Sequence, residues 1–298
     1  MTFLKQITIK RPSFLIVCMS KVSKTVTFDY KNKKGLSAGE ARIISDLAAS
    51  GKQIVSLSDF LEKTGSSARN RVMVSRLAKK GWLIRLTRGK YLISPLASGS
   101  KGRWTTHEFL IASCFAKEYY IGFMNALNFY GFTEQVPMDV TIAVRKPLKN
   151  REVLGIKFNF VLLPKKRFFG VSKVNISGIN INISDKEKTI IDALSHPEHC
   201  GGIMEVAKVV YNSKKHVDLA KLCRYAAQNG KKSVFNRLGY LLDLFGILES
   251  SSVAHIIERN ISKGYVALSP GESRAGKYNS RWRVFANVLP ERLLSVRE

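Results

Sequence analysis

The spacing of apolar residues predicts three short helices in the first third of the chain. The motif Ser37-Ala-Gly-Glu40 has the pattern of a capping box, and apolar residues follow it at helical spacing until Gly51. A second helix is expected over residues 56–65 and a third over residues 66–80, each opened by serines and closed by a glycine. The chain therefore begins its ordered part with a small helical cluster.

The pattern changes from helical to strand-like after the third helix. Residues 82–86 and 91–94 read as two strands, and Thr87-Arg-Gly-Lys90 between them has the composition of a hairpin turn. Three helices and a basic-tipped hairpin predict a winged helix-turn-helix over residues 36–96. The alternative is a helical bundle with a hairpin and no role in DNA binding. That alternative does not account for the serines that open the third helix or for the basic residues at the hairpin tip.

The third predicted helix has an inner and an outer face. Val74, Leu77 and Ala78 share one face, which we expect to pack on the first two helices. Arginine has the donors that read guanine in the major groove, and asparagine has the groups that read adenine. Serines at a helix amino terminus suit a phosphate, and a basic hairpin tip suits the DNA backbone or the minor groove. The predicted DNA-binding residues are Ser66, Ser67, Arg69, Asn70, Arg71, Met73, Arg76, Lys80, Arg88 and Lys90.

The remaining two thirds of the chain mix strand and helix patterns. A helix capped by Thr105-x-x-Glu108 and another over residues 121–130 are expected first. Strands are expected at residues 138–145, 156–163 and 174–183, helices at 185–195, 203–212, 218–228 and 233–245, and extended chain at 264–269 and 278–288. These patterns predict an α+β protein, in which the winged helix-turn-helix precedes a larger mixed α/β and helical domain. The expected parts are a basic arm (1–35), the winged helix (36–96) and a carboxy-terminal domain (101–298) with an α/β part (101–184) and a mainly helical part (185–298).

The charge of the chain indicates the kind of partner that the protein binds. The sequence carries 49 Lys and Arg against 22 Asp and Glu, a formal net charge of +27. Residues 63–107 hold eleven basic residues and no carboxylate. A solvated helix normally mixes charges of both signs, because opposite charges one turn apart stabilise it. A surface without acids is expected to meet a polyanion, so the distribution points to nucleic acid.

Composition excludes several other classes. The longest unbroken apolar run, from Phe14 to Met19, has six residues. A membrane span needs roughly 20 and a signal-peptide core about 7–15. The four cysteines are scattered without a CxxC pair, which indicates neither a disulfide scaffold nor a zinc ribbon. We therefore expect a cytoplasmic protein with no membrane partner.

Several segments in the carboxy-terminal part resemble one known family. They are Gly122-Phe-Met-Asn-Ala-Leu-Asn-Phe-Tyr-Gly-Phe-Thr-Glu-Gln135, Lys166-Lys-Arg-Phe-Phe-Gly170, Ile183-Ser-Asp-Lys-Glu-Lys-Thr-Ile-Ile-Asp192, Pro197-Glu-His-Cys-Gly-Gly202 and Asn236-Arg-Leu-Gly-Tyr-Leu-Leu242. In this order they resemble the AbiEi-type antitoxins of type IV toxin–antitoxin and abortive-infection systems, which act in phage defence. The resemblance runs over most of residues 36–290.

The resemblance implies a function as well as a fold. In that family an amino-terminal winged helix joins a larger antitoxin domain. Such proteins repress their own operon at inverted repeats and neutralise a nucleotidyltransferase toxin, directly or indirectly. The expected partners are therefore double-stranded operator DNA and a cognate toxin. The alternative is an RNA- or tRNA-binding accessory protein without operator specificity.

Three motifs with possible chemistry were weighed against simpler explanations. Gly271-x4-Gly276-Lys277 is close to a P-loop, but Tyr278 stands where Ser or Thr should ligate magnesium. His196-Pro-Glu-His199-Cys200 groups three types of metal ligand, yet it lies at a turn and lacks CxxC partners. Asp185, Glu187 and Lys188 have the residue types of a nuclease site, but a capping box explains them. Trp104, Phe168 and Phe169 are expected in the core rather than stacked on bases. We predict no catalytic residue, no cofactor and no metal.

Antitoxicity is expected to reside in residues 101–298. Lysines of its helices are predicted to be exposed and available to a toxin or its RNA substrate, whereas four apolar positions are predicted to hold the core. The predicted exposed lysines are Lys186, Lys188, Lys214 and Lys215, and the core positions are Ile190, Ile191, Leu238 and Leu241.

Overall fold

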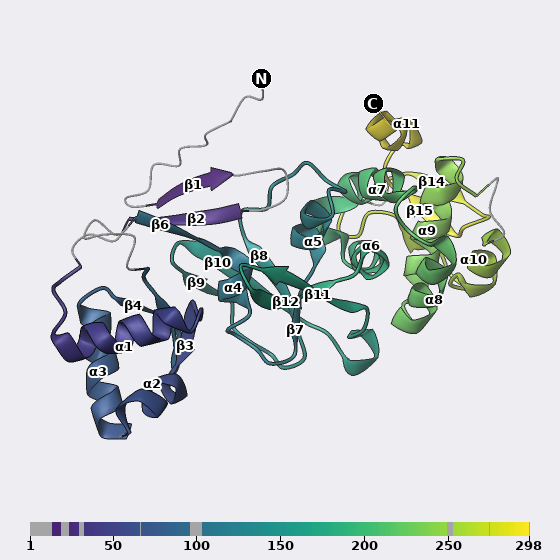
Figure 1. Ribbon diagram of the computed structural model, residues 1–298. Coiled ribbons are helices and arrows are strands. Elements are labelled where there is room, and N and C mark those ends of the chain that lie inside the picture. The colour runs from purple at the N-terminus through teal and green to yellow at the C-terminus, as the bar shows by residue number, and fades with distance from the viewer. Residues whose placement is uncertain are drawn as a thin grey trace. The chain divides into compact units, whose positions relative to one another are not determined.

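The computed structural model of the chain has an α+β fold (Figure 1). It describes residues 14–18, 24–29, 33–65, 67–95, 103–248, 253–273 and 275–297. The chain divides into two compact units, which we call unit 1 and unit 2. Unit 1 comprises Met1–Lys117, Glu152–Ile156 and Asn175–Asn180, and unit 2 comprises Glu118–Arg151, Lys157–Val174 and Ile181–Glu298. Residues 101–117, which the sequence places with the carboxy-terminal domain, group here with unit 1.

The three helices of unit 1 form where the capping residues predict them. They are α1 (Ala38–Ala49), α2 (Leu57–Thr64) and α3 (Ser67–Lys79). Ser37 and Glu40 make a reciprocal capping box at α1, and Ser56 and Asp59 make one at α2. These contacts satisfy amide groups that the first helical turn leaves without partners. Gly65 ends α2 in a left-handed conformation with φ of 66°, which glycine adopts without steric cost.

A three-stranded sheet completes the helical cluster of unit 1. Its strands β3 (Ile54–Ser56), β4 (Leu83–Thr87) and β5 (Lys90–Ile93) lie in the order β3-β5-β4, and both pairs are antiparallel. The sequence analysis predicted β4 and β5 but not β3, because a strand of three residues shows too little alternation. The element order α1-β3-α2-α3-β4-β5 places a helix-turn-helix-like region before a two-stranded hairpin.

The core of this part of unit 1 is small and apolar. Ile44, Phe60 and Leu77 come from the three helices, and each is fully buried. Leu83 and Val55 of the sheet lie in the same cluster. Full burial of such a side chain contributes about 1.5–3 kcal/mol. Burial of the apolar residues that recur at helical spacing therefore stabilises the packing of the helices on the sheet.

The segment predicted to be an unpatterned arm contains two strands. Strands β1 (Phe14–Cys18) and β2 (Lys24–Asp29) pair antiparallel, and β2 also pairs with β6 (Arg103–His107). The apolar run of β1 carries no alternation, so the pattern could not identify it. Because Thr105 lies within β6, opposite Thr27, the predicted capping box of Thr105 and Glu108 does not form.

His107 instead caps the helix that follows β6. The ring nitrogen Nδ1 of His107 accepts a hydrogen bond of 3.1 Å from the amide of Phe109, at the start of α4 (Glu108–Ala112). An accepting nitrogen requires the neutral ring. Burial lowers the pKa of His107 to about 4, which keeps the ring neutral at physiological pH.

A six-stranded mixed sheet contributes most of its residues to unit 2, whereas Glu152–Ile156 and Asn175–Asn180 of its strands and turns group with unit 1. The strands are β7 (Tyr119–Ile121), β8 (Val140–Val144), β9 (Arg151–Val153), β10 (Ile156–Leu162), β11 (Val171–Ile176) and β12 (Ile179–Ser184), in the order β11-β12-β7-β8-β10-β9. Strands β12 and β7 are parallel, β7 and β8 antiparallel, and β8 and β10 parallel. The single strand predicted at residues 174–183 is wrong. Ser177 and Gly178 both have positive φ and turn the chain between β11 and β12.

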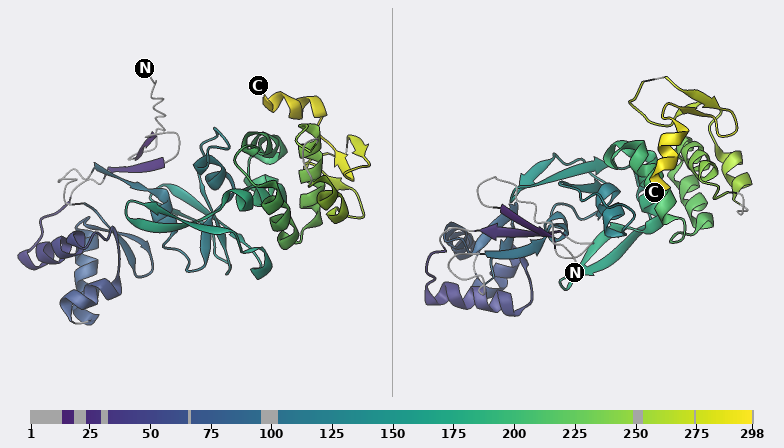
Figure 2. Two further views of the ribbon diagram at one scale, coloured as in Figure 1. Left: turned by 45° about the vertical axis from the view of Figure 1, so that its right-hand side comes forward. Right: turned by 90° about the horizontal axis from the view of Figure 1, so that it is seen from above.

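Helices of unit 2 match their predicted positions closely. They are α5 (Phe123–Phe129), α6 (Lys186–Ser195), α7 (Gly202–Ser213), α8 (Leu219–Asn229) and α9 (Lys232–Leu244), and two short 3-10 turns, η2 (Lys165–Arg167) and η3 (Pro197–His199), lie between them. Helix α6 contacts α7, α8 and α9, and Figure 2 shows these green helices grouped together in both views. The predicted core positions Ile190, Ile191, Leu238 and Leu241 are buried, as expected.

A small sheet and two short helices complete the carboxy-terminal end. Strands β13 (Val266–Ala267), β14 (Lys277–Asn279) and β15 (Val284–Ala286) follow α10 (Ala254–Asn260) and precede α11 (Pro290–Leu294) and η4 (Ser295–Arg297). Trp282 packs so closely on Gly239 of α9 that an added Cβ would lie 2.1 Å from its ring. Among the described residues, no helix is both long enough and apolar enough to cross a bilayer.

Candidate nucleic-acid interface

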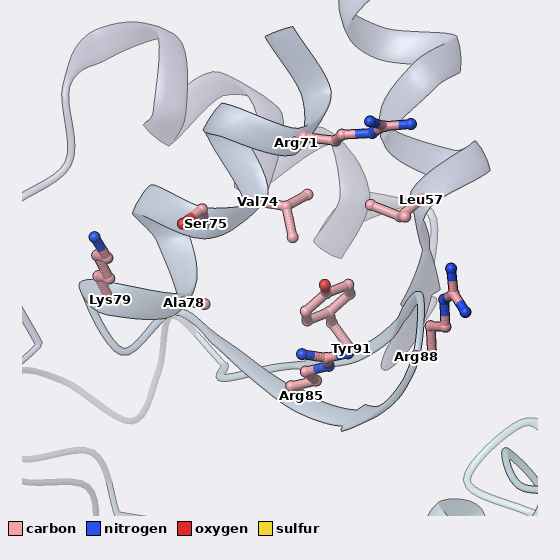
Figure 3. Close-up of a pocket in the computed structure, with 9 residues that line it drawn as sticks. All are labelled: Leu57, Arg71, Val74, Ser75, Ala78, Lys79, Arg85, Arg88 and Tyr91. Atoms are coloured by element: carbon pink, nitrogen blue, oxygen red, sulfur yellow. The ribbon is translucent and has the colours of Figure 1, made fainter. Parts of the chain in front are cut away.

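An open hollow lies between α3 and the β4–β5 hairpin of unit 1 (Figure 3). Its volume is about 710 Å³. Helix α3 and the hairpin each contribute two basic side chains to its wall, and Tyr91 and Leu57 lie between them. The lining residues are Leu57, Arg71, Val74, Ser75, Ala78, Lys79, Arg85, Arg88 and Tyr91.

The outer face of α3 adjoins this hollow. Arg71, Ser75 and Lys79 are one turn apart along the helix and are exposed. Val72, whose side chain is 50% exposed, and Arg76 extend the same surface away from the hairpin. An exposed valine among arginines is unusual on a solvated helix, but it suits contact with the methyl group of thymine.

Two carboxylates of the helical cluster, Glu40 of α1 and Asp59 of α2, are paired with cations. Glu40 of α1 accepts from the ammonium of Lys80 at 2.5 Å, and this bond lowers the pKa of Glu40. Burial tends to raise the pKa of Asp59, but hydrogen bonds from Lys52 and Ser56 outweigh it and bring the pKa to about 2. These two acids are therefore held by Lys52 and Lys80, neither of which lines the hollow.

The basic residues of the hollow are, by contrast, uncompensated. Within the described ranges, Arg71, Lys79, Arg85 and Arg88 make no ion pair. All four side chains are exposed. Their number and convergence give a surface that attracts phosphate groups, which is the electrostatic property of a nucleic-acid interface.

Asn70 is not on the surface of α3, contrary to the prediction that it reads a base. Its side chain is only 3% exposed, and its amide nitrogen lies 3.4 Å from the carbonyl oxygen of Leu57, to which it donates. This contact joins α3 to the first turn of α2. Asn70 therefore belongs to the buried face of α3, together with Val74 and Leu77.

Two further predicted DNA-binding residues also serve the fold. Met73 is half-buried and packs against the apolar cluster of unit 1. Lys80 follows the last residue of α3, and its ammonium is held by Glu40. Arg69 and Arg76, which were also predicted to bind DNA, are exposed.

The hairpin and the start of α3 account for the remaining predicted residues. Arg88 lies in the turn and lines the hollow. Lys90 begins β5, and its ammonium donates to the carbonyl oxygen of Cys114 at 3.0 Å, so it is directed away from the tip. Ser67 is the first residue of α3. Ser66 lies outside the described residues. Sequence analysis missed Arg85, because a strand position gave no sign that it faces α3.

The possible nuclease residues of unit 2 have separate structural partners. Asp185 caps α6, and Glu187 pairs with Lys221 at 2.7 Å. Lys188, predicted to be exposed, is fully buried and pairs with Asp192 at 2.6 Å. The sequence pattern failed here because a lysine can be buried when a carboxylate one turn away neutralises it.

The remaining motifs are placed as follows. Ligand atoms of His196, Glu198 and His199 lie within 4.8 Å of one another, and Nδ1 of His196 is 3.0 Å from the carboxylate of Glu198. Lys277 begins strand β14 and not a helix, so the P-loop geometry is missing there. Phe168 packs against Tyr120 and Phe169 against Tyr225, whereas the side chain of Trp104 is outside the described residues.

Unit 1 thus has a helix-turn-helix-like fold with a basic outer surface. Residues 42–94 match the family described as "Transcriptional regulator, AbiEi antitoxin". This match spans the helices and the hairpin that form the hollow, and it confirms the AbiEi-type resemblance. Residues 42–94 are an AbiEi-type antitoxin and regulator domain.

A likeness at the level of the whole fold was also found. The chain is similar in structure to the Rv2827c protein from Mycobacterium tuberculosis, with a TM-score of 0.68 and 12% sequence identity over 92% of this chain and 99% of that chain. At this identity the likeness concerns the fold alone. No curated protein sequence matches the chain.

Proposed function

We propose that the chain is a cytoplasmic autorepressor and antitoxin. Unit 1 binds inverted repeats in the promoter of its own operon, and the larger carboxy-terminal part neutralises a cognate nucleotidyltransferase toxin. In this proposal the chain has no catalytic activity of its own. The AbiEi-type domain at residues 42–94 supports both roles in general terms.

The observation that carries the DNA-binding role is the uncompensated basic hollow. Arg71 and Lys79 of α3 lie across from Arg85 and Arg88 of the hairpin (Figure 3). A DNA backbone lying along this hollow would bring phosphates to cations from both elements. The exposed face of α3, with Val72 and Arg76, would then enter the adjacent major groove.

In this arrangement some residues bind phosphates and others read bases. Side chains at the hollow contact phosphates and fix the position of α3, but they carry no sequence information. Selectivity for an operator would come from Arg76, Val72 and Arg69 on the outer face. Because an inverted repeat presents two equivalent half-sites, two copies of the chain would bind one operator.

Repression and antitoxicity should be separable by substitution in the full chain. We expect Arg71→Ala with Arg88→Ala to abolish repression of a reporter driven by the native promoter, because both cations leave the hollow. The same variant should still restore growth when co-expressed with the cognate nucleotidyltransferase toxin of this proposal. Loss of rescue at an equal protein level, measured by immunoblot, would show that the two activities share this surface.

A further inference from the structure

Three cationic side chains of unit 2 converge on the turn between α8 and α9. Lys166 lies across Gly230, where an added Cβ would be 2.6 Å from its ammonium nitrogen. Arg167 donates its Nε to the carbonyl oxygen of Asn229 at 3.4 Å. The ammonium of Lys231 donates to the carbonyl oxygen of Ser195 at 2.7 Å. The 3-10 turn η2, the end of α6 and the α8–α9 turn therefore bring these groups together.

These contacts leave most of the donors of the three side chains unused. A lysine ammonium has three donors, and Lys231 uses one of them on Ser195. Among the described residues, Arg167 donates only through Nε, so its two terminal amino groups are available to a ligand. Lys166 is exposed to solvent. The cluster has capacity to bind a ligand with several acceptor oxygens.

Buried polar atoms without partners lie beside the cluster. In the described part of the chain, the buried hydroxyl of Ser195, Nε2 of His196 and Oδ1 of Asn229 have no hydrogen-bond partner. Ser195 and Asn229 are 3% and 1% exposed. Such atoms are rare in folded proteins and call for an explanation. Their grouping next to Lys231 and Arg167 marks this junction as unusual.

The start of α9 adds to the positive potential. This helix, Lys232–Leu244, has 13 residues, and Lys231 stands at its N-cap position without any side-chain capping bond. Its first amide groups are thus not capped by a side chain, and the helix dipole places partial positive charge at this end. Anions bind at such ends in proteins.

Few acids offset this positive charge. Arg237 is a further buried cation nearby, and it donates to the carbonyl oxygens of Leu194 and Leu268. The carboxylate of Glu198 lies within hydrogen-bond distance, 3.0 Å, of Nδ1 of His196. Burial lowers the pKa of Lys231, and the charges of Arg237 and Arg167 lower it further.

We propose that this junction is a binding site for a phosphate group carried by a nucleotide or a nucleic-acid strand. Lys166, Arg167 and Lys231 would surround the phosphate oxygens, and the amide groups at the start of α9 would complete the site. A phosphate dianion offers more acceptors and more charge than a carboxylate, so it matches three cations and a helix amino terminus better. The site is formed wholly within unit 2 and is separate from the basic hollow of unit 1.

Binding of AMP and adenosine to the full chain tests this site. Isothermal titration should show binding of AMP and no binding of adenosine, which lacks the phosphate. Lys166→Glu and Lys231→Gln should each weaken AMP binding about tenfold or more, because each removes a charge-assisted contact. Lys173→Glu, at an exposed lysine of β11, is the matched control and should change nothing.

A second arm distinguishes a free nucleotide from a strand. A labelled single-stranded 5′-phosphorylated RNA is titrated into the Arg71→Ala, Arg88→Ala chain, in which the hollow of unit 1 is disabled. If Lys166→Glu weakens RNA binding but AMP does not bind, the phosphate belongs to a strand. Circular dichroism confirms that each variant is folded. If Lys166→Glu and Lys231→Gln bind both probes as well as Lys173→Glu does, the proposal is overturned, and the DNA-binding role of unit 1 is unaffected.

Discussion

A chain carrying Arg71→Ala and Arg88→Ala should bind its promoter DNA about 100-fold more weakly than the native chain. A charge-assisted hydrogen bond from an arginine to a phosphate contributes about 1.5–3 kcal/mol, and about 1.4 kcal/mol corresponds to a tenfold change in affinity. The two residues stand on α3 and on the hairpin, so the variant removes one cation from each side of the hollow. Fluorescence anisotropy with a labelled promoter fragment measures the effect.

The matched control for this variant removes two charges elsewhere in unit 1. Lys34 and Arg42 are exposed and lie before and on α1, away from the residues that line the hollow. Lys34→Ala with Arg42→Ala lowers the net charge equally, so any general electrostatic loss appears in both chains. An equal loss of affinity in the two variants would show that net charge, and not the hollow, binds the DNA.

Replacing Asp192 with alanine should destabilise unit 2 by about 3–5 kcal/mol, because it leaves a buried lysine without its partner. Lys188 and Asp192 are 0% and 2% exposed, and their charged atoms are 2.6 Å apart. The hydroxyl of Tyr120 donates to the second oxygen of Asp192 at 2.7 Å and would lose its acceptor too. Urea unfolding followed by circular dichroism measures the loss.

Two further variants separate charge from packing in this prediction. Lys188→Met with Asp192→Asn removes both charges and keeps an acceptor for Tyr120, so it should recover most of the lost stability. Arg224→Ala removes an exposed partner of Asp218 and should cost less than about 1 kcal/mol. If Asp192→Ala unfolds at the same urea concentration as Arg224→Ala, the buried pair of Lys188 and Asp192 does not stabilise unit 2.

Local signals in the sequence were sufficient to predict the positions of most helices. Capping residues located α1 and α2 because a helix start has chemical requirements that few side chains meet. The core of α3 was predicted correctly at Val74 and Leu77, since apolar periodicity records burial directly. Helices α6 to α9 were placed within a residue or two for the same reason.

Features that depend on tertiary contacts were not predictable. Asn70 and Lys188 are polar residues at buried positions, and their partners, Leu57 and Asp192, are identified only when the helices are in place. Short strands such as β3, β7 and β9 have three residues each, which is too few to show a period. Hydrophobic patterns report burial on average and cannot identify a buried polar group.

The same limit applies to the arrangement of basic residues at the candidate site. The absence of acids after Lys63 correctly marked a basic surface, because it is a property of composition. Which basic residues share that surface depends on where the hairpin lies relative to α3. Arg85 could therefore be identified as a lining residue only from the structure. Lys80 and Lys90 do not line the hollow, because Lys80 contacts Glu40 and Lys90 contacts Cys114.

The central claim is that the basic surface of unit 1 binds a DNA duplex, and the salt dependence of promoter binding by the full chain tests it most directly. If each chain neutralises about 5–8 phosphates, the logarithm of the binding constant should fall with the logarithm of salt concentration at a slope of roughly −4.5 to −7. That slope is the expected result. A slope near about −1 would contradict the claim, because it would mean that the positive charge of unit 1 does not neutralise a DNA backbone.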